Sequence, residues 1–452
     1  MQNESHHKAN GTNPGETLGA LSSVLLPVVA RGAVVRRPVG EALATATGGD
    51  RRLISTLRAL RERHGDDPLP LSYTGRRIAL VLAAEDVRVL LRGTPDPFSP
   101  VGAEKRGALA HFQPHGALVF AQEDRPRRRE ANEQALALGR TIHPEARTIA
   151  AHADEEARAL VAALRNAGSL GGVLDWARFS RTFDALARRV VFGAFAARDR
   201  RTTDLLRRLR ARANRSYLSP VDRRTRGSFL DRVRADVDRA DPDALAARPG
   251  RPCSEERPED QAAHWLFAFD SAAIATFRAL ALLTSQGTTA ETARVEGLTQ
   301  DGLDLPLLRA TLRESVRLWP TTLMVIRESL RETTWRERTI EPGTAFLVMS
   351  GYFHRDASRL PYADSFEPAI WADGRAEREP AILPFGYGPA GCPGRDLVPM
   401  TVSFFLRALL RGGPLHRVDE APPLRRHELP ASLDHFTLRF SYQGTAQGGI
   451  DL

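Results

Sequence analysis

The residue of this sequence best suited to do chemistry is a single cysteine within a glycine-rich segment. Cys392 lies in the segment 385–395, FGYGPAGCPGR, directly before an apolar helical pattern. Glycines permit unusual backbone angles, so main-chain N–H groups can turn towards the sulfur, and a helix start adds partial positive charge. Both effects favour a thiolate, which can bind iron and donate electron density to it. The alternative is a buried structural cysteine, which is the usual state of a lone Cys.

Glu314 and Arg317 form the second informative pair. On a predicted helix these two residues share one face and can pair, because they are three positions apart. Exposed pairs of this kind are common and contribute only about 0.3–0.5 kcal/mol. The position of this pair is more informative: it lies roughly 75 residues before Cys392, and Pro320 ends its helix almost at once.

The composition excludes several classes of protein. The chain has 452 residues, 42% of them hydrophobic, which is enough for a substantial core. Two distant cysteines cannot make a disulfide framework or a cysteine-rich zinc site, and they suit a reducing, cytoplasmic location. The net charge of +9 comes from arginines that are interleaved with acids, which is typical of solvated helix faces and not of nucleic-acid binding. The longest apolar stretch, 264–283, contains Asp270 and Arg278, so we expect a buried helix and no membrane span.

The elements that must position these residues are mostly helices. Residues 1–20 are polar, and we expect a disordered tail. Segments with apolar residues at three- and four-residue spacing predict helices at 87–91, 127–138, 144–166, 176–192, within 201–240 (two helices), and at 260–285, 305–318 and 394–410. A hairpin is expected at 68–82 and strands at 324–327 and 345–349, while 93–115 has no periodicity and is expected to be a loop. The fold class is mainly α with small β-sheets, and 21–452 forms one large domain.

Taken together, these motifs resemble those of the cytochrome P450 family of haem-thiolate monooxygenases. The order is Glu-x-x-Arg at 314–317, an arginine in a strand at Arg327, and Phe-x-x-Gly-x-x-x-Cys-x-Gly at 385–394. The resemblance covers roughly residues 50–440, and the cysteine segment is its most specific part. It implies the cytochrome P450 fold enclosing a haem b cofactor, in a bacterial-type enzyme without a membrane anchor.

The resemblance also implies roles for individual residues. Cys392 would be the proximal iron ligand, with Phe385 beside the thiolate and the haem, in a loop shaped by Gly386 and Gly394. Glu314 and Arg317 would form a buried network that ties their helix to the segment before the cysteine loop. Arg327 would bind a haem propionate through its fork of donors.

The sequence departs from the family pattern in three places. Two residues before the cysteine the family usually has His or Arg for a propionate, and here Ala390 stands there. Arg128, in a run of three arginines, is the candidate substitute, and a basic surface turn is the alternative. Pro399 lies inside the last long helix, where it removes a backbone donor, so we expect a local kink.

The oxygen-activating residues need a separate interpretation, because the family's central helix usually carries an acid followed by Thr. The favoured alignment here places Asp270 and Ser271 at these positions as a proton-relaying pair. A shift by one residue puts Ser271 and Ala272 there and leaves no pair. An Asp in so apolar a helix is costly unless it is partnered or functional, so a structural carboxylate paired with an arginine is the alternative for Asp270.

The expected function is therefore oxidation of a small organic substrate with O₂. Electrons would come from a separate ferredoxin or flavodoxin with its reductase, and a basic face that includes Arg395 would suit such an acidic partner. Competing hypotheses keep the haem but use peroxide, or couple or desaturate substrates. A haem sensor or carrier without turnover is a further alternative.

Overall fold

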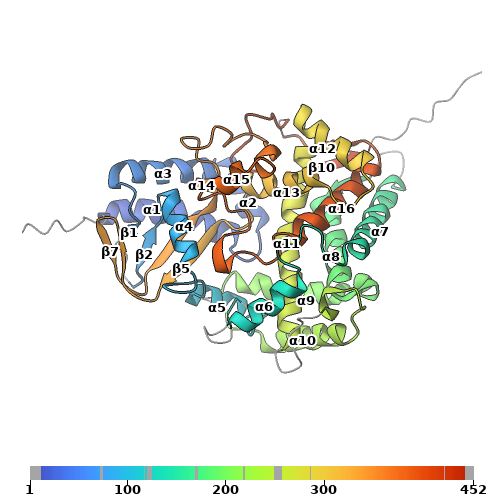
Figure 1. Ribbon diagram of the computed structural model, residues 1–452, viewed down its shortest axis with the longest axis horizontal. Coiled ribbons are helices and arrows are strands. Elements are labelled where there is room, and N and C mark those ends of the chain that lie inside the picture. Colours follow the sequence, from blue (N-terminus) through green and yellow to red (C-terminus); the bar gives the residue numbers. More distant parts are fainter. Residues whose placement is uncertain are drawn as a thin grey trace, which may run out of the picture.

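The predicted fold class is confirmed: the chain is mostly helical, with three small sheets (Figure 1). The computed structural model describes residues 12–71, 75–116, 118–119, 125–167, 172–216, 219–248, 257–285, 287–421 and 423–442. The helices before the central one are α1 Pro14–Arg31, α2 Pro38–Ala46, α3 Gly49–His64, α4 Ala84–Arg92, α5 Ala103–Leu109, α6 Arg125–Ala135, α7 Ala146–Arg165, α8 Trp176–Phe192, α9 Arg200–Ala213 and α10 Arg223–Asp238. The later helices are α11 Pro258–Leu283, α12 Thr288–Thr299, α13 Pro306–Leu318, α14 Ser350–His354, α15 Arg375–Arg378 and α16 Leu397–Arg411.

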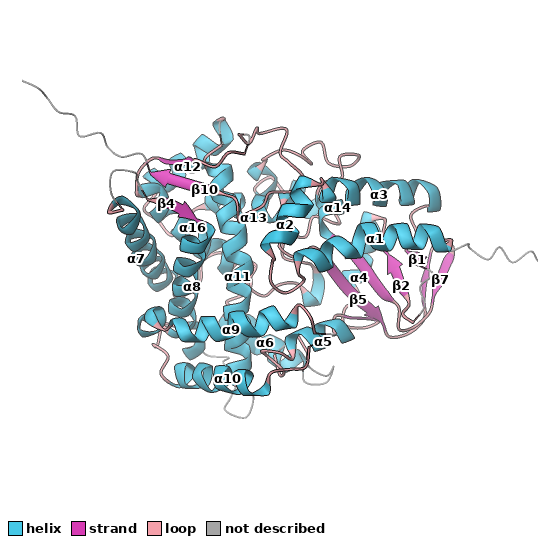
Figure 2. Cartoon of the chain, turned by 180° about the vertical axis from the view of Figure 1, so that it is seen from behind, coloured by secondary structure: helices cyan, strands magenta, loops and turns pink. Residues whose placement is uncertain are grey.

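The central element is α11, which runs through the middle of the molecule in both ribbon views (Figures 1 and 2). It begins with Pro258 and carries Glu259 and Asp260 in its first turn, a combination that suits a helix start. By length and composition it could cross a membrane, but 78% of its most apolar window is buried inside the protein. It packs against α8, α10, α13 and α16, so its hydrophobic faces are used in the core, as the sequence predicts.

The sheets lie beside the helical part, and the largest is covered by the N-terminal helices. Its five strands have the order β1-β2-β8-β5-β3, with β1 Leu69–Leu71, β2 Ile78–Leu80, β3 Phe98–Ser99, β5 Met324–Ser329 and β8 Ala345–Met349. The other sheets are β4-β10-β9, from Val173–Asp175, Arg439–Tyr442 and Leu415–Arg417, and β6-β7, from Thr333–Trp335 and Arg338–Ile340. The predicted hairpin is confirmed, because Leu69 pairs with Leu80 in antiparallel register.

The prediction of a disordered tail over 1–20 is wrong for its last seven residues. The helix α1 begins at Pro14, and Asn13 caps it by accepting the N–H of Glu16 at 2.8 Å, while the Glu16 carboxylate accepts the N–H of Asn13. This reciprocal capping box satisfies the free donors of a helix start. Ala20, on the inner face of α1, is buried in the core. Residues 1–11 lie outside the described part of the chain.

Two further expectations are corrected. The segment 93–115 is not wholly a loop, because it contains β3 and α5, which were too short to show periodicity. Pro399 does not interrupt α16, because it is the third residue of that helix. The first four N–H groups of a helix have no partner within it, so a proline there costs no hydrogen bond.

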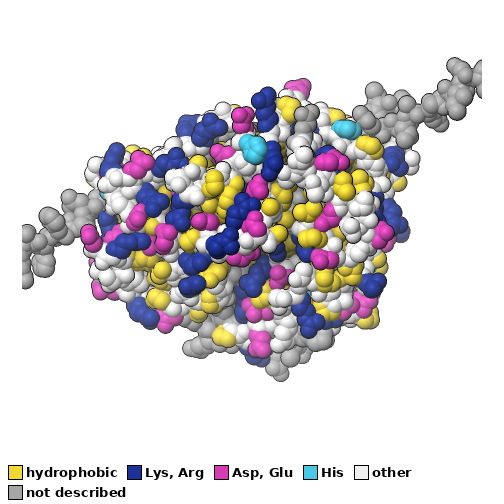
Figure 3. Space-filling view, turned by 45° about the horizontal axis from the view of Figure 1, so that its top comes forward, with side chains coloured by type: hydrophobic (Ala, Val, Ile, Leu, Met, Phe, Trp, Pro, Cys, Tyr) yellow, Lys and Arg dark blue, Asp and Glu magenta, His cyan; other side chains and the backbone are white. Residues whose placement is uncertain are grey.

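The charged side chains are distributed as the composition suggests. Figure 3 shows Lys and Arg interspersed with Asp and Glu over one face of the molecule. Many arginines form ion pairs with nearby acids, for example Arg207 with both Asp184 and Asp204 at 2.7 Å. On this face the two signs of charge are therefore mixed.

Candidate functional site

The cysteine segment forms a tight loop between the end of α15 and the start of α16. The N–H of Cys392 donates to the carbonyl of Phe385 at 2.7 Å, which closes the loop on itself. Gly386 and Gly388 have φ angles of +70° and +68°, in the left-handed region that favours glycine. Cys392 and Phe385 are both half-buried, so the sulfur lies within the protein and is still accessible.

The helix α4 lies directly against this loop and fixes its position. A Cβ atom on Gly388 would come within 2.4 Å of the carbonyl oxygen of Leu91, near the end of α4. Such a contact is sterically impossible, so residue 388 must be glycine in this arrangement. On the outer side of the loop, the Tyr387 hydroxyl accepts from Arg92 at 3.2 Å, and the guanidinium of Arg88 lies 5.4 Å from the centre of the same ring. The loop is thus held by α4 on two sides.

The environment of the sulfur favours metal binding over free reactivity. Burial raises the pKa of the Cys392 thiol, while the N–H of Gly394 bonded to the sulfur and the nearby charges of Arg129 and Arg395 act in the opposite direction. A Cβ on Gly394 would lie 3.8 Å from the sulfur, so the loop backbone passes close to it. The free side chain is therefore a thiol at neutral pH, and a bound metal would stabilise its deprotonated form.

Glu314 and Arg317 form the predicted pair, and both side chains are fully buried. Arg317 donates to the two carboxylate oxygens of Glu314 at 2.6 and 2.8 Å. It also donates to the carbonyls of His354, Ala363 and Ser365 at 3.2, 3.1 and 2.7 Å. A buried bidentate pair with these further bonds satisfies most of the donors of the guanidinium. The pairing prediction is confirmed.

The same network extends towards the cysteine loop. Glu314 accepts from the N–H of Glu367 at 2.8 Å and from the indole of Trp371 at 3.1 Å. The ring of His354, whose pKa is lowered to about 3 by burial and then by the charge of Arg317, accepts the N–H of Leu383 at 3.0 Å. Since Leu383 is two residues before Phe385, α13 is tied to the segment that precedes the cysteine loop. This connection also agrees with the prediction.

Arg327 is buried in β5, with 5% of its surface exposed. Its Nε donates to the hydroxyl of Thr94 at 3.0 Å and its Nη1 to the carbonyl of Ile326 at 2.9 Å. Thr94 follows α4, the helix that supports the cysteine loop, so Arg327 lies beside the same structural unit. A buried arginine here suits a carboxylate of a bound group, and its role in propionate binding stays a prediction.

Arg129, the neighbour of the predicted propionate anchor Arg128, contacts the cysteine loop. Arg129 donates to the carbonyl of Gly391 at 2.6 Å and pairs with Glu133 one turn later on α6. Arg128 instead donates to the carbonyl of His115 at 3.1 Å. The helix α6 turns by about 100° per residue, so neighbouring arginines point to different elements. Arg129 is thus a second candidate for the missing anchor, and the role of Arg128 stays a prediction.

Asp270 is paired with an arginine, as the structural alternative expected. Its carboxylate accepts a hydrogen bond from Arg210 of α9, whose side chain is 7% exposed. Arg210 also lies over the ring of Phe267, with its Cζ 5.2 Å from the ring centre. The pairing offsets the cost of an acid in an apolar helix. A role of Asp270 in proton relay is neither required nor contradicted by this geometry and stays a prediction.

Ser271 lies on a different face of α11 from the ion pair. In the middle of this otherwise buried helix, the half-exposed residues include His264, Ala268 and Ser271. Spacings of four and three residues put these three on one face. This face is thus partly accessible in the middle of the central helix, and Ala268 and Ser271 carry small side chains there. Neither of the two alignments of the acid and alcohol is excluded by this arrangement.

The residues present fit a haem. The accessible sulfur of Cys392 would bind the iron of such a group. Arg129 and Arg327, on separate elements that both adjoin the loop or its supporting helix, are suited to its two carboxylates. Within the described residues, no cluster of His, Cys, Asp and Glu could hold a metal ion by itself.

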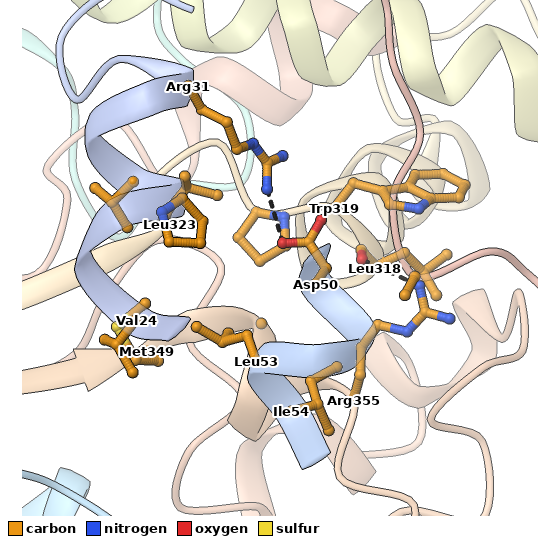
Figure 4. Close-up of a pocket in the computed structure, with 15 residues that line it drawn as sticks. Val24, Arg31, Asp50, Leu53, Ile54, Leu318, Trp319, Leu323, Met349 and Arg355 are labelled. Atoms are coloured by element: carbon orange, nitrogen blue, oxygen red, sulfur yellow. Dashed lines mark hydrogen bonds and ion pairs between the residues drawn. The ribbon is translucent and has the colours of Figure 1, made fainter. Parts of the chain in front are cut away.

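A separate cavity lies between α1, α3 and the chain that follows α13 (Figure 4). Apolar side chains such as Val24, Leu53 and Trp319 line it, and Arg31 points across it to pair with Asp50 at 2.7 Å. None of its lining residues belongs to the cysteine loop. This cavity is thus separate from the cysteine loop.

Sequence reasoning missed the contact of Arg129 with the loop. One signal was available: Arg129 is three residues before the buried Asn132 and seven before the buried Leu136, so it shares their inward face. Cys253 lies outside the described residues.

Comparison with known proteins agrees with this site. The family model described as "Cytochrome P450" matches residues 291–426. Dimethylnonatriene synthase of Arabidopsis thaliana is 33% identical over 123 residues, which are 26% of this chain and 24% of that protein. Cyclooctat-9-en-7-ol 5-monooxygenase of Streptomyces melanosporofaciens is 32% identical over 121 residues, 26% of each protein. The matched segments thus span about a quarter of the length of these curated relatives.

The fold is shared over a much longer stretch. The crystal structure of CYP175A1 from Thermus thermophilus superposes with a TM-score of 0.64, covering 89% of this chain and 97% of that one at 21% identity. The region matched by the family model contains the Glu314–Arg317 pair, Arg327 and the whole cysteine loop, which are the parts whose geometry is described above. Residues 291–426 thus match the cytochrome P450 family model, and the chain shares its fold with cytochrome P450 structures.

Proposed function

We propose that this protein is a haem-thiolate oxidoreductase that oxidises a small organic substrate with O₂ and electrons from a separate partner. The observation that carries the proposal is the accessible sulfur of Cys392, held in a closed glycine loop and supported by α4. The family implies a haem-iron cofactor, and haem b is the form we propose. When bound, it would supply oxygen activation, with the thiolate donating electron density to the iron.

The side chains around the site would have distinct tasks in this activity. Cys392 would bind the metal, and Arg129 and Arg327 would hold the carboxylates of the cofactor. The Glu314–Arg317 network would keep the loop in place through Leu383. Ala268 and Ser271, on the accessible face of α11, would border the substrate and O₂, and the Ser271 hydroxyl could donate a proton there. The apolar surroundings would exclude bulk water.

The state of Asp270 bears on which reaction is favoured. As long as Asp270 is paired with Arg210, its carboxylate is not free for relay, so delivery of protons through it would require the pair to open. This observation supports a second candidate, in which the enzyme uses peroxide or abstracts hydrogen to couple or desaturate its substrate. Turnover with peroxide and turnover with a redox partner, measured on the same substrate panel, distinguish the two candidates.

The electron donor we propose is an acidic ferredoxin or flavodoxin with its reductase. Arg88 and Arg92 lie on the outer side of the cysteine loop around Tyr387, and Arg395 is exposed at its end. A cluster of cations next to the cofactor suits an acidic partner. Arg395→Glu should slow electron transfer, and the slowing should be larger at low salt, where charges are less screened. An unchanged rate contradicts this part of the proposal. A cytoplasmic location and a substrate from secondary metabolism belong to the same proposal.

The test of the proposal is the spectrum of the reduced protein with carbon monoxide. The wild-type protein, purified with haem, should show the strongly red-shifted Soret band of a thiolate-ligated haem. Cys392→Ala should abolish this band, whereas Cys253→Ala should leave it unchanged. A wild-type protein without haem, or a band that survives in Cys392→Ala, refutes the proposal. A haem protein that shows the band but gives no product with any electron source or peroxide is a sensor or carrier.

A further inference from the structure

The outer face of the first two helices is apolar and exposed. Among the described residues, the five most exposed large hydrophobic side chains all lie on α1 and α2. They are Val39, Leu18, Leu26, Val29 and Leu43, with 81%, 70%, 63%, 61% and 56% of their surfaces exposed. None of the exposed residues of either helix is charged, although 26% of the whole chain is. A helix that is apolar on all sides is usually covered on all sides, so this face indicates a partner.

The apolar side chains of the two helices form one continuous face. On α1, Leu18, Leu26 and Val29 are separated by eight and three residues, so they lie on one side of the helix. The helix α2 packs directly against the end of α1, because a Cβ atom on Gly40 would come within 2.3 Å of the carbonyl oxygen of Ala30. Figure 2 shows α1, α2 and α3 side by side on the face of the molecule seen there. We call the exposed side of α1 and α2 the N-terminal face.

The N-terminal face is held in place from beneath. Arg31, at the end of α1, donates to the two carboxylate oxygens of Glu41 on α2 at 2.9 and 3.0 Å, and both side chains are buried. The connection between the helices is fixed by Asn214 at the end of α9, whose side-chain oxygen accepts the N–H groups of Val34 and Val35 at 2.8 and 3.1 Å. A surface that is fixed in advance loses little conformational entropy when it binds.

The helix α3, which flanks this face, carries charges of opposite sign at its two ends. Arg51 and Arg52 are exposed at its start, two residues after α2 and its turn, and among the described residues neither forms an ion pair. Glu62 is exposed near its end, and it too has no cation partner in the described part of the chain. This end lies beside the start of α1, because Arg63 pairs with Glu16. Arg51 and Glu62 are eleven residues apart and therefore lie along one side of α3.

We infer that the N-terminal face is a homodimer interface, on which a second copy of this chain packs about a two-fold axis perpendicular to α3. Such an axis makes the two α3 helices antiparallel, so Arg51 of each copy faces the partner's Glu62 at both edges of the contact. The apolar side chains of α1 and α2 would lie between these two charge pairs. A hydrophobic centre with a polar rim is the usual composition of a specific interface. This inference goes beyond the proposed function, because association does not depend on the reaction.

The size of the face agrees with a dimer. At 1.5 Å per residue α1 is about 27 Å long, and a helix is about 10 Å wide, so the outer sides of α1, α2 and α3 together cover roughly 650 Å². Specific interfaces bury about 600–1,000 Å² on each partner. The N-terminal face and its flank are therefore large enough for a stable contact with a second copy.

A lipid surface fits this face less well. Helices that lie in a membrane interface are rich in Lys and Arg on their polar side and carry Trp or Phe among their apolar residues. Between Glu16 and Arg31, α1 has neither a cation nor an aromatic residue. The exposed carboxylate of Glu62 would be repelled by anionic headgroups, whereas the two-fold arrangement pairs it with an arginine.

Sedimentation equilibrium of the holoprotein measures the association directly. The wild-type protein should be a dimer with a dissociation constant below about 10 µM. Leu26→Glu and Val39→Glu each place a charge on the apolar face, and a two-fold dimer contains each position twice. At about tenfold for each position, either variant should weaken the dimer about a hundredfold. Leu298→Glu, at a leucine of α12 that is 51% exposed and lies outside the face, is the matched control and should change the constant less than about twofold.

A charge exchange tests the two-fold arrangement. Arg51→Glu and Glu62→Arg should each weaken the dimer about threefold or more, and the effect should be larger at low salt. The double variant exchanges the two charges and pairs them again, so its dissociation constant should return to within about twofold of the wild-type value. A double variant that associates no better than the single ones overturns this arrangement.

Three further results overturn the inference. The first is a wild-type protein that stays monomeric at about 100 µM, and the second is a dimer that Leu26→Glu and Val39→Glu leave intact. The third is a monomer that sediments with vesicles of phosphatidylcholine and phosphatidylglycerol and loses this binding in the same two variants, which makes the face a lipid contact. The carbonyl band should be the same in all these variants. Its loss from the wild-type protein refutes the proposed function instead, and sedimentation still decides the association.

Discussion

Replacing Arg317 with methionine should destabilise the protein more than any other single change on α13. This guanidinium donates five hydrogen bonds, two to Glu314 and three to backbone carbonyls, and neither side chain of the pair is exposed. The methionine side chain fills much of the volume but leaves a buried carboxylate and three carbonyls without this donor. Breaking a buried pair by removing one partner costs about 3–5 kcal/mol. That is a large part of the roughly 5–15 kcal/mol by which folded domains are stable.

The same reasoning predicts a partial rescue. Glu314→Gln in addition to Arg317→Met removes the uncompensated charge, and the carboxamide oxygen introduced at position 314 can still accept from Trp371 or from the N–H of Glu367. The double variant should therefore be more stable than Arg317→Met alone, by about 1–3 kcal/mol. A second substitution that restores stability in this way is expected when the two residues interact directly, so that their effects on the free energy of unfolding do not add.

Urea unfolding of the holoprotein, followed by far-ultraviolet circular dichroism and by the Soret band, measures both effects. Arg309→Met is the matched control, because Arg309 lies on the same helix and pairs with Asp304, whose side chain is 68% exposed. Arg309 is itself buried, with 10% of its side chain exposed, but the carboxylate that its loss would leave behind stays in contact with water. The control should therefore lose much less than Arg317→Met. A loss from Arg317→Met as small as that of the control, or a double variant less stable than the single one, refutes the argument that the network holds α13 to the cysteine loop.

Three further predictions concern the site and its surroundings. Arg129→Leu should weaken haem retention about tenfold or more, measured by haem transfer to apomyoglobin, while Arg128→Leu should have little effect; equal effects contradict the assignment of Arg129. Asp270→Asn should increase the share of electrons lost to peroxide if Asp270 relays protons, and unchanged coupling marks its pair with Arg210 as structural. Burial raises the pKa of Asp260 from 3.8 to about 6, so the folded protein favours the protonated carboxyl group. The stability that this preference contributes is fully present below pH 4 and is lost as the pH rises through 6. Asp260→Asn should therefore gain up to about 3 kcal/mol over the wild-type protein at pH 7.5 and little at pH 4, and equal gains at both pH values contradict the raised pKa.

Much of the site could be predicted because its chemistry is encoded locally. The cysteine loop is specified by glycines within ten residues, and two of them have the positive φ angles that such a loop requires. Glu314 and Arg317 are one helical turn apart, so their pairing follows from spacing alone. The central helix was evident from a long run of apolar residues, since burial on all sides leaves no polar face.

The parts that could not be predicted depend on contacts between distant segments. Which of Arg128 and Arg129 meets the loop is decided by the rotation of α6 about its axis, which a run of identical residues does not reveal. The partner of Asp270 is 60 residues earlier, on α9, and the choice among the many arginines there needs the packing of α9 on α11.

The close contact between Gly388 and the carbonyl of Leu91 has a mechanical consequence. Because there is no room for even one methyl group between them, α4 and the cysteine loop must move together as one body. Arg88 and Arg92 project from that same helix and hold the ring of Tyr387 within the loop. We therefore expect a protein that docks on these two arginines to press, through α4 and Gly388, on the loop that carries Cys392.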